Sequence, residues 1–214
     1  MGDYLFARSF QLMTEPGQIR VLAILANASA TIAEGEVLQL TAAQDLATTE
    51  EIYLKVVRGK TAALFSAATE VGGVIAGAPE DQVRALFDYG DALGIAFQIA
   101  DDLLDYGGTA AVTGKNVGDD FRERKLTLPL IKAVAKADAE ERAFWVRVIE
   151  KGDQRDGDLE HALAIMARHG ALEAARADAL AWADRARAAL RSLPDHPLRQ
   201  VLDDLSSYVV ARLA

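Results

Sequence analysis

The run LGIAFQIADDLLD, residues 93–105, decides how the fold of this chain is predicted. Asp101 and Asp105 stand one helical turn apart, and Gln98 lies one turn before them, so all three share one face of an α-helix. The residues before Gln98 are apolar, which indicates that this helix is buried. The pattern predicts a long helix over Glu80–Tyr106 that carries a polar stripe near its C-terminus.

Helical periodicity continues on both sides of this run, and the alternation typical of strands is almost absent. We therefore predict an all-α fold in a single domain, residues 1–214. The Ala- and Gly-rich helices of residues 17–106 are expected to be buried on more than one side. The longest irregular stretch is Gly107–Leu126, which is polar enough to be functional. The predicted helices are Gly2–Met13, Gln18–Gln39, Glu50–Ala68, Glu80–Tyr106, Leu128–Lys136, Ala139–Lys151, Leu159–His169, Leu172–Ser192 and Pro197–Leu213.

Composition narrows the function classes. The chain has no cysteine, which excludes disulfides, thiolate metal sites and cysteine nucleophiles. Its net charge of −9 argues against binding to a nucleic-acid backbone. We find no uninterrupted apolar run of spanning length and no basic region followed by an apolar leader, so we expect no membrane span and a cytoplasmic protein.

The aspartates of the central run indicate a metal site. Asp101, Asp102 and Asp105 lie near a helix C-terminus, where the macrodipole disfavours anions. Two such charges about 4 Å apart repel by about 4 kcal/mol at an effective dielectric of about 20. A hard divalent cation offsets this repulsion, and oxygen ligands shared with substrate phosphates suit Mg²⁺. The alternative is a solvated acidic helix end, which we would favour for a bare pair of aspartates.

A few lysines stand out in this acidic chain. Lys60 and Thr61 fall within an apolar helix, and Lys115 and Lys125 flank the loop after the aspartates. Lysine binds phosphate as a point charge, and threonine adds a hydroxyl donor. Each lysine alone is explained by solvation or by a side chain that reaches the surface. Together with the aspartates, they indicate a diphosphate that is bridged by metal and held by lysines.

The place of three other polar residues stays open. Glu34, Glu36 and Gln39 either face the cavity that would hold the diphosphate or form a polar seam between helices. The histidines are expected to be surface or packing residues rather than metal ligands: His161, His169 and His196.

At this point the sequence resembles the trans-type polyprenyl diphosphate synthases. The match is dense from Gly2 to about Leu130. The sequences of these motifs are most similar to those of bacterial long-chain members, the octaprenyl and decaprenyl diphosphate synthases. The matching motifs, in chain order, are GDYLF (2–6), EGE (34–36), GKTA (59–62), FQIADDLLD (97–105), GKNVGDD (114–120) and KLTLP (125–129).

The resemblance implies an isoprenoid-synthase-like helical bundle around a central cavity. It implies a Mg²⁺-dependent prenyltransferase that condenses isopentenyl diphosphate with an allylic prenyl diphosphate, in isoprenoid and ubiquinone side-chain biosynthesis. It also implies a homodimer. The roles that it assigns are Mg²⁺ ligands at Asp101, Asp102 and Asp105, diphosphate contacts at Lys60, Lys115 and Lys125, residues beside the ionising carbon at Thr61 and Gln98, and ordering of metal-bound water at Asp120.

One departure from the family pattern is serious. A first aspartate-rich motif with paired arginines, and a Gly-Gly-Lys-Arg type segment for isopentenyl diphosphate, are not found. We therefore expect a C-terminal portion with N-terminal helices missing, exposed apolar surface and impaired activity. The alternative is a non-catalytic helical subunit or remnant that binds prenyl diphosphate or a full-length synthase. A weaker alternative is another class I terpenoid enzyme.

Overall fold

The computed structural model describes residues 1–107 and 117–213. These residues form helices and no strand, so the all-α prediction is confirmed. The helices are α1 (Gly2–Thr14), α2 (Ile19–Ala42), α3 (Glu50–Val57), η1 (Arg58–Ala62), α4 (Ala63–Ile75), α5 (Glu80–Gly107), α7 (Asp119–Arg122), α8 (Leu128–Lys136), α9 (Ala139–Trp145), η2 (Val146–Glu150), α10 (Asp158–Arg168), α11 (Ala171–Ala189), η3 (Leu190–Ser192) and α12 (Pro197–Ala211).

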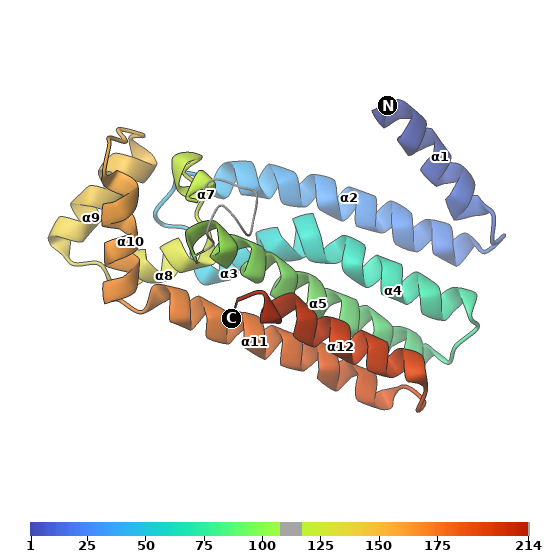
Figure 1. The fold of residues 1–214 in the computed structure, drawn as a ribbon. Coiled ribbons are helices and arrows are strands. Elements are labelled where there is room, and N and C mark those ends of the chain that lie inside the picture. The colour runs from blue at the N-terminus through green and yellow to red at the C-terminus, as the bar shows by residue number, and fades with distance from the viewer. Residues whose placement is uncertain (108–116, 214) are drawn as a thin grey trace.

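The bundle is organised around α5, which lies between α4 on one side and α11 on the other (Figure 1). Tyr89, Ile95 and Ile99 of α5 are fully buried. A stripe of small residues on α11 lets the two helices approach closely: Ala175, Ala179, Ala183 and Ala186 are all buried. On the opposite side, a Cβ added at Gly94 would lie 2.6 Å from Ala62 Cα, so α5 and η1 also pack backbone to backbone.

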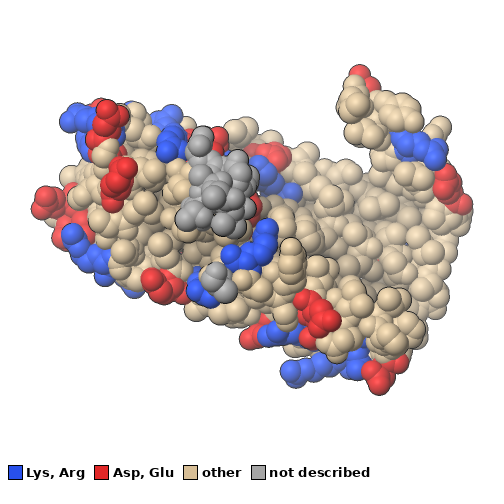
Figure 2. All heavy atoms as spheres, viewed as in Figure 1, with Lys and Arg blue, Asp and Glu red and all other residues tan. Residues whose placement is uncertain are grey.

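Two helices in the N-terminal half are largely exposed, and for one of them, α2, this differs from the prediction. Helix α1 has no buried residue, and it projects from the bundle at the upper right of Figure 1. Helix α2 buries only Val21, Ala28 and Gly35, so the prediction that it is buried on more than one side is wrong. The surface over α2 and α4 carries few charged side chains (Figure 2).

Helix α2 also differs from the expectation that no segment reaches the length of a membrane span. Over an 18-residue window its mean hydropathy is 1.4, and by length and composition it is the one described helix that could cross a membrane. Polar residues such as Asn27, Ser29 and Glu34 interrupt the apolar run, which is why a search for uninterrupted apolar residues passes over this helix.

At the other end of the bundle, polar contacts hold the short helix α7 in place. Gln154 donates from Nε2 to the Phe121 carbonyl (2.9 Å) and to the Val148 carbonyl (3.2 Å). Arg147 and Asp158, on either side of Gln154 in the sequence, form a bidentate ion pair with N–O distances of 2.8 and 2.7 Å. These contacts fix α7 against the bundle, next to the C-terminal end of α5.

Candidate functional site

A cavity of about 840 Å³ lies where α2, η1, α5 and α7 meet. It is lined by most of the residues that the sequence singles out: Lys60, Thr61, Gln98, Asp101, Asp102, Asp105, Asp120 and Lys125. Lys115 lies outside the described residues, so its predicted role stays a prediction. Arg212 near the C-terminus also lines the cavity, with its guanidinium 5.4 Å from the centre of the Phe97 ring.

Lys60 and Thr61 reach the cavity from an unusual turn. Residues 58–62 form a π-helical turn between α3 and α4, a feature that often marks functional sites. Helix α2 crosses this turn at very short range, since a Cβ added at Gly35 would lie 2.5 Å from the Lys60 backbone nitrogen. The crossing places the Lys60 ammonium beside α2.

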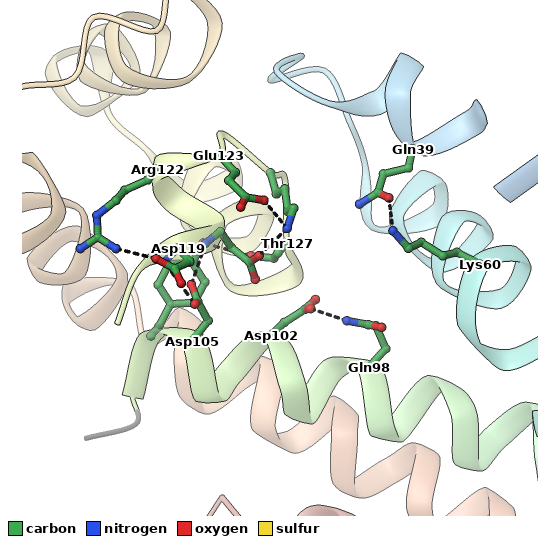
Figure 3. Close-up of polar contacts among 12 residues, drawn as sticks. Gln39, Lys60, Gln98, Asp102, Asp105, Asp119, Arg122, Glu123 and Thr127 are labelled. Carbon is green, nitrogen blue, oxygen red and sulfur yellow. Dashed lines mark hydrogen bonds and ion pairs between the residues drawn. The ribbon is translucent and has the colours of Figure 1, made fainter. Parts of the chain in front are cut away.

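The contacts of Lys60 show that the polar residues on α2 have different surroundings, so neither interpretation holds for all three. Lys60 Nζ donates to Gln39 Oε1 (2.7 Å) and pairs with Glu36 Oε1 (3.2 Å). Figure 3 shows Gln39 and Lys60 across the site from Gln98 and Asp102 of α5. Gln39 therefore faces the cavity, Glu36 pairs with the lysine, and Glu34 is exposed.

In the cavity wall, four polar side chains form a continuous chain of hydrogen bonds. Thr61 Oγ1 donates to Gln98 Oε1 (2.9 Å), and Gln98 Nε2 donates to Asp102 Oδ1 (2.8 Å). The Tyr53 hydroxyl donates to the other oxygen, Asp102 Oδ2 (2.6 Å). Both carboxylate oxygens of Asp102 thus accept a hydrogen bond from the protein itself.

Burial dominates the electrostatics of this chain. It raises the pKa of Asp102 to about 7, although the hydrogen bonds from Tyr53 and Gln98 act in the opposite direction. Burial also raises the pKa of Tyr53 well above its usual value, and the charge of Asp102 adds to this effect. Sequence reasoning missed Tyr53, because its partner lies 49 positions away and no local pattern links the two.

Asp105 connects α5 to α7. Its carboxylate accepts backbone N–H groups of Asp119 (3.2 Å) and Asp120 (3.0 Å), while its carbonyl accepts from the Gly118 N–H (2.8 Å). The free N–H groups at a helix start are ready partners for a carboxylate. Burial raises the pKa of Asp105, partly offset by these backbone hydrogen bonds.

Lys125 faces the cavity from the far side of α7. Its ammonium pairs with Glu123 (2.6 Å) and Asp120 (3.1 Å). Burial lowers the pKa of Lys125, but the hydrogen bonds with Glu123 and Asp120 outweigh it and raise that pKa overall. Figure 3 shows Glu123 beside α7, close to the carboxylates at the end of α5.

The carboxylates at the cavity suit a divalent cation that is held only in part by the protein. Among the described residues, no three acidic or imidazole side chains converge where a single ion would contact them all. Asp102 and Asp105 also direct their oxygens to protein donors. Such a set suits an ion that takes one or two carboxylates and completes its shell with phosphate oxygens and water.

The histidines lie away from this cavity in packing and capping positions. His169 contacts Glu141, His161 packs against Phe144, and His196 accepts the Leu198 N–H at the start of α12.

Comparisons with known proteins match both the sequence and the fold. A family model for polyprenyl synthetase matches residues 1–166. The chain is 44% identical over 212 residues to octaprenyl diphosphate synthase of Escherichia coli (strain K12). The alignment covers 99% of this chain and 65% of that protein. The chain is also 40% identical over 213 residues to an all-trans-nonaprenyl-diphosphate synthase of Rhodobacter capsulatus, which covers 100% of this chain and 65% of that protein.

Two solved structures have nearly the same fold. A decaprenyl diphosphate synthase from Rhodobacter capsulatus superposes with a TM-score of 0.95 at 77% identity, over 100% of this chain and 66% of that one. A polyprenyl synthase from Caulobacter crescentus CB15, complexed with calcium and isoprenyl diphosphate, gives 0.94 at 47% identity, over 100% and 65%. The chain thus spans about two-thirds of the length of these relatives. Its motifs, its fold and these matches agree: the chain belongs to the polyprenyl synthetase family.

Proposed function

We propose that this chain carries the part of a long-chain polyprenyl diphosphate synthase that binds an allylic prenyl diphosphate, which is condensed with isopentenyl diphosphate. The observation that carries this proposal is the cavity itself. One side presents the carboxylates at the end of α5, the other sides present Lys60 and Lys125, and apolar residues such as Val56 and Leu104 fill the wall between them.

In this proposal the lysines bind the diphosphate. Lys60 and Lys125 exchange their present acidic partners for phosphate oxygens, with Lys115 as a third contact. Asp101 and Asp105 hold Mg²⁺, and the role of Asp102 as a third ligand stays a prediction. When bound, Mg²⁺ adds positive charge that stabilises the departing diphosphate.

The remaining residues of the site act on the carbon end of the substrate. Thr61 and Gln98 line the cavity and are hydrogen-bonded to each other, which supports a place for them beside the carbon that loses the diphosphate. Apolar side chains around them keep water from an allylic cation.

The same proposal extends to partners and location. The exposed apolar residues of α1 and α2 support a chain that works against another polypeptide surface, and we propose a homodimer. A non-catalytic subunit would share this surface. It would bind prenyl diphosphate without turning it over. A cytoplasmic location stays a prediction.

Calorimetry tests the proposal. We expect an allylic diphosphate to bind in the presence of Mg²⁺ and to lose its affinity when a chelator is added. Incubation with labelled isopentenyl diphosphate, an allylic primer and Mg²⁺, followed by butanol extraction, then separates the catalytic proposal from the binding subunit. Equal affinity with and without the chelator contradicts the metal-bridged site.

A further inference from the structure

The hydrogen-bond chain from Thr61 to Asp102 has a defined direction. Thr61 donates to Gln98, Gln98 donates to Asp102, and Tyr53 donates to Asp102 from the other side. The four residues come from α3, η1 and α5, so the chain joins three elements of the bundle. Asp102, where both ends meet, is only 4% exposed. Every donor in the chain therefore points toward one buried carboxylate.

The chemistry of the side chains shows why Asp102 sets this direction. A carboxylate offers only acceptors, whereas an amide has one accepting and one donating end. Gln98 must turn its NH₂ group toward Asp102, which leaves its carbonyl oxygen for Thr61. The single hydroxyl proton of Thr61 then points at Gln98. Because Thr61 lines the cavity, the hydroxyl presents lone pairs to a ligand there.

We infer that Asp102 is a positioning residue that acts through Gln98 to keep Thr61 an acceptor toward the cavity, with Tyr53 as its anchor. The catalytic consequence rests on the proposed function. An oxygen lone pair beside a carbon that becomes positive stabilises the transition state, whereas a hydroxyl proton at the same place opposes it.

This assignment differs from a metal-ligand role for Asp102. A ligand needs lone pairs that reach the cavity. Each oxygen of Asp102 already accepts a hydrogen bond from the protein, and Asp102 is only 4% exposed. Asp105 also accepts protein N–H groups, but it is less buried than Asp102. Removing Tyr53 or Gln98 as a partner would leave a buried carboxylate with an unmet acceptor, which is unfavourable. The present hydrogen bonds therefore fix the orientation of the Asp102 carboxylate in the cavity wall.

The substitution Asp102→Asn gives the sharpest test, because asparagine keeps the shape but has one donor and one acceptor. The hydroxyl proton of Tyr53 takes the new carbonyl oxygen, so the new NH₂ group faces Gln98 and forces its amide to rotate. Adding Tyr53→Phe removes the competing donor and lets the asparagine carbonyl face Gln98 again. The second substitution, Tyr53→Phe, is thus expected to restore the orientation of the Gln98 amide that Asp102→Asn reverses.

Nuclear magnetic resonance measures the direction without any substrate, at pH 8 or above, where Asp102 is ionised and offers only acceptors. In the ¹⁵N-labelled chain, the side-chain amide signal of Gln98 is assigned by its loss in Gln98→Met. We expect a downfield, slowly exchanging amide proton in the wild type and in Tyr53→Phe. The signal should lose both properties in Asp102→Asn and regain them in the double variant.

Kinetics measures the consequence. For Asp102→Asn we expect kcat to fall by at least about 10-fold, as one misdirected hydrogen bond in a buried site implies. KM for the allylic diphosphate should change less than about 2-fold, because Asp102 does not contact it. In the double variant kcat should recover, although a second buried hydrogen-bonding group has been removed.

Three results would overturn the inference. They are an unchanged Gln98 signal in Asp102→Asn, a double variant slower than the single one, and loss of Mg²⁺-dependent diphosphate binding in Asp102→Asn. The last result would make Asp102 a metal ligand. A wild-type chain that shows the expected amide signals but no turnover supports the positioning and favours the binding subunit over the catalytic proposal.

Discussion

Asp102 is an ionisable group that is only 4% exposed, although it lines the cavity, and its burial has a consequence for stability. Burial raises its pKa from 3.8 to about 7, so the folded chain holds a proton that the unfolded chain releases. The stability from this group is therefore fully present below about pH 4 and is lost as the pH rises through about 7.

We expect the free energy of unfolding of the wild type to fall between pH 4 and pH 8 by more than that of Asp102→Asn, which stays neutral. The difference is on the order of 4 kcal/mol for a shift of about three pKa units. Urea unfolding without Mg²⁺ measures it. Parallel pH profiles for the two proteins would show that Asp102 is ionised at little energetic penalty in the folded chain.

Lys60 offers a second test at the scale of one side chain. Lys60→Met is expected to weaken binding of an allylic diphosphate by about 10-fold or more, the usual contribution of a hydrogen bond to a charged group. Lys55→Met is the matched control, because Lys55 pairs with Glu51 on the surface of α3 and does not line the cavity. Calorimetry that gives equal losses for both variants would contradict a direct contact at Lys60.

At the scale of the elements, the crossing of α2 over the π-helical turn holds Lys60 in place. Gly35→Ala would put a Cβ 2.5 Å from the Lys60 nitrogen and 2.8 Å from the Gly59 carbonyl carbon, and backbone atoms cannot move aside alone. We expect a loss of about 1–3 kcal/mol in stability together with weaker diphosphate binding.

Gly72→Ala provides the control for that experiment. Gly72 lies within α4, and an added Cβ there meets nothing within 4 Å. Thermal denaturation should show Gly72→Ala unchanged or more stable by about 0.5–1 kcal/mol, as expected for alanine in a helix. If Gly35→Ala behaved in the same way, the close crossing would not constrain the site.

The sequence predicts helices well where periodicity is strong and long. Leu128–Lys136 is predicted with its observed bounds, and the end of α5 is predicted to within one residue. The π-helical turns at Arg58–Ala62 and Val146–Glu150 are not predicted, because residue types do not reveal a shift from i+4 to i+5 bonding. Helix α7 is missed because four residues are too few to show a period.

Local sequence patterns also limit which residues of the site can be predicted. Residues that share one helix, such as Gln98, Asp101 and Asp105, are grouped correctly by spacing alone. Tyr53 joins them only through tertiary packing, which a single sequence does not encode in any local pattern. Lys60 and Lys125 are brought to the same site by the chemistry of phosphate binding and by the family resemblance, because spacing alone cannot link them to the aspartates.

For the whole molecule, the exposed apolar side chains of α2 predict association. Ile19, Val37 and Leu40 are each more than 60% exposed. We expect light scattering to give twice the 23.0 kDa of one chain, and Val37→Glu to shift the mass toward one chain. Leu180→Glu, on α11, is the control and should leave the mass unchanged.

A wild-type mass of one chain would contradict the homodimer. Flotation with lipid vesicles then distinguishes the other use of the same helix, because a chain held in a membrane through α2 would rise with the vesicles.

The ion pairs around the cavity make the site resemble an ion exchanger that is already loaded with its own counterions. Each lysine holds a carboxylate, Lys60 with Glu36 and Lys125 with Asp120 and Glu123. A chloride or a lone phosphate would displace those carboxylates and leave them without a counterion. A polyanion that arrives together with its own divalent cations satisfies the lysines and the released carboxylates at once. We therefore expect the site to select a ligand by its balance of positive and negative charge, and simple salts to compete poorly with a metal-bound diphosphate.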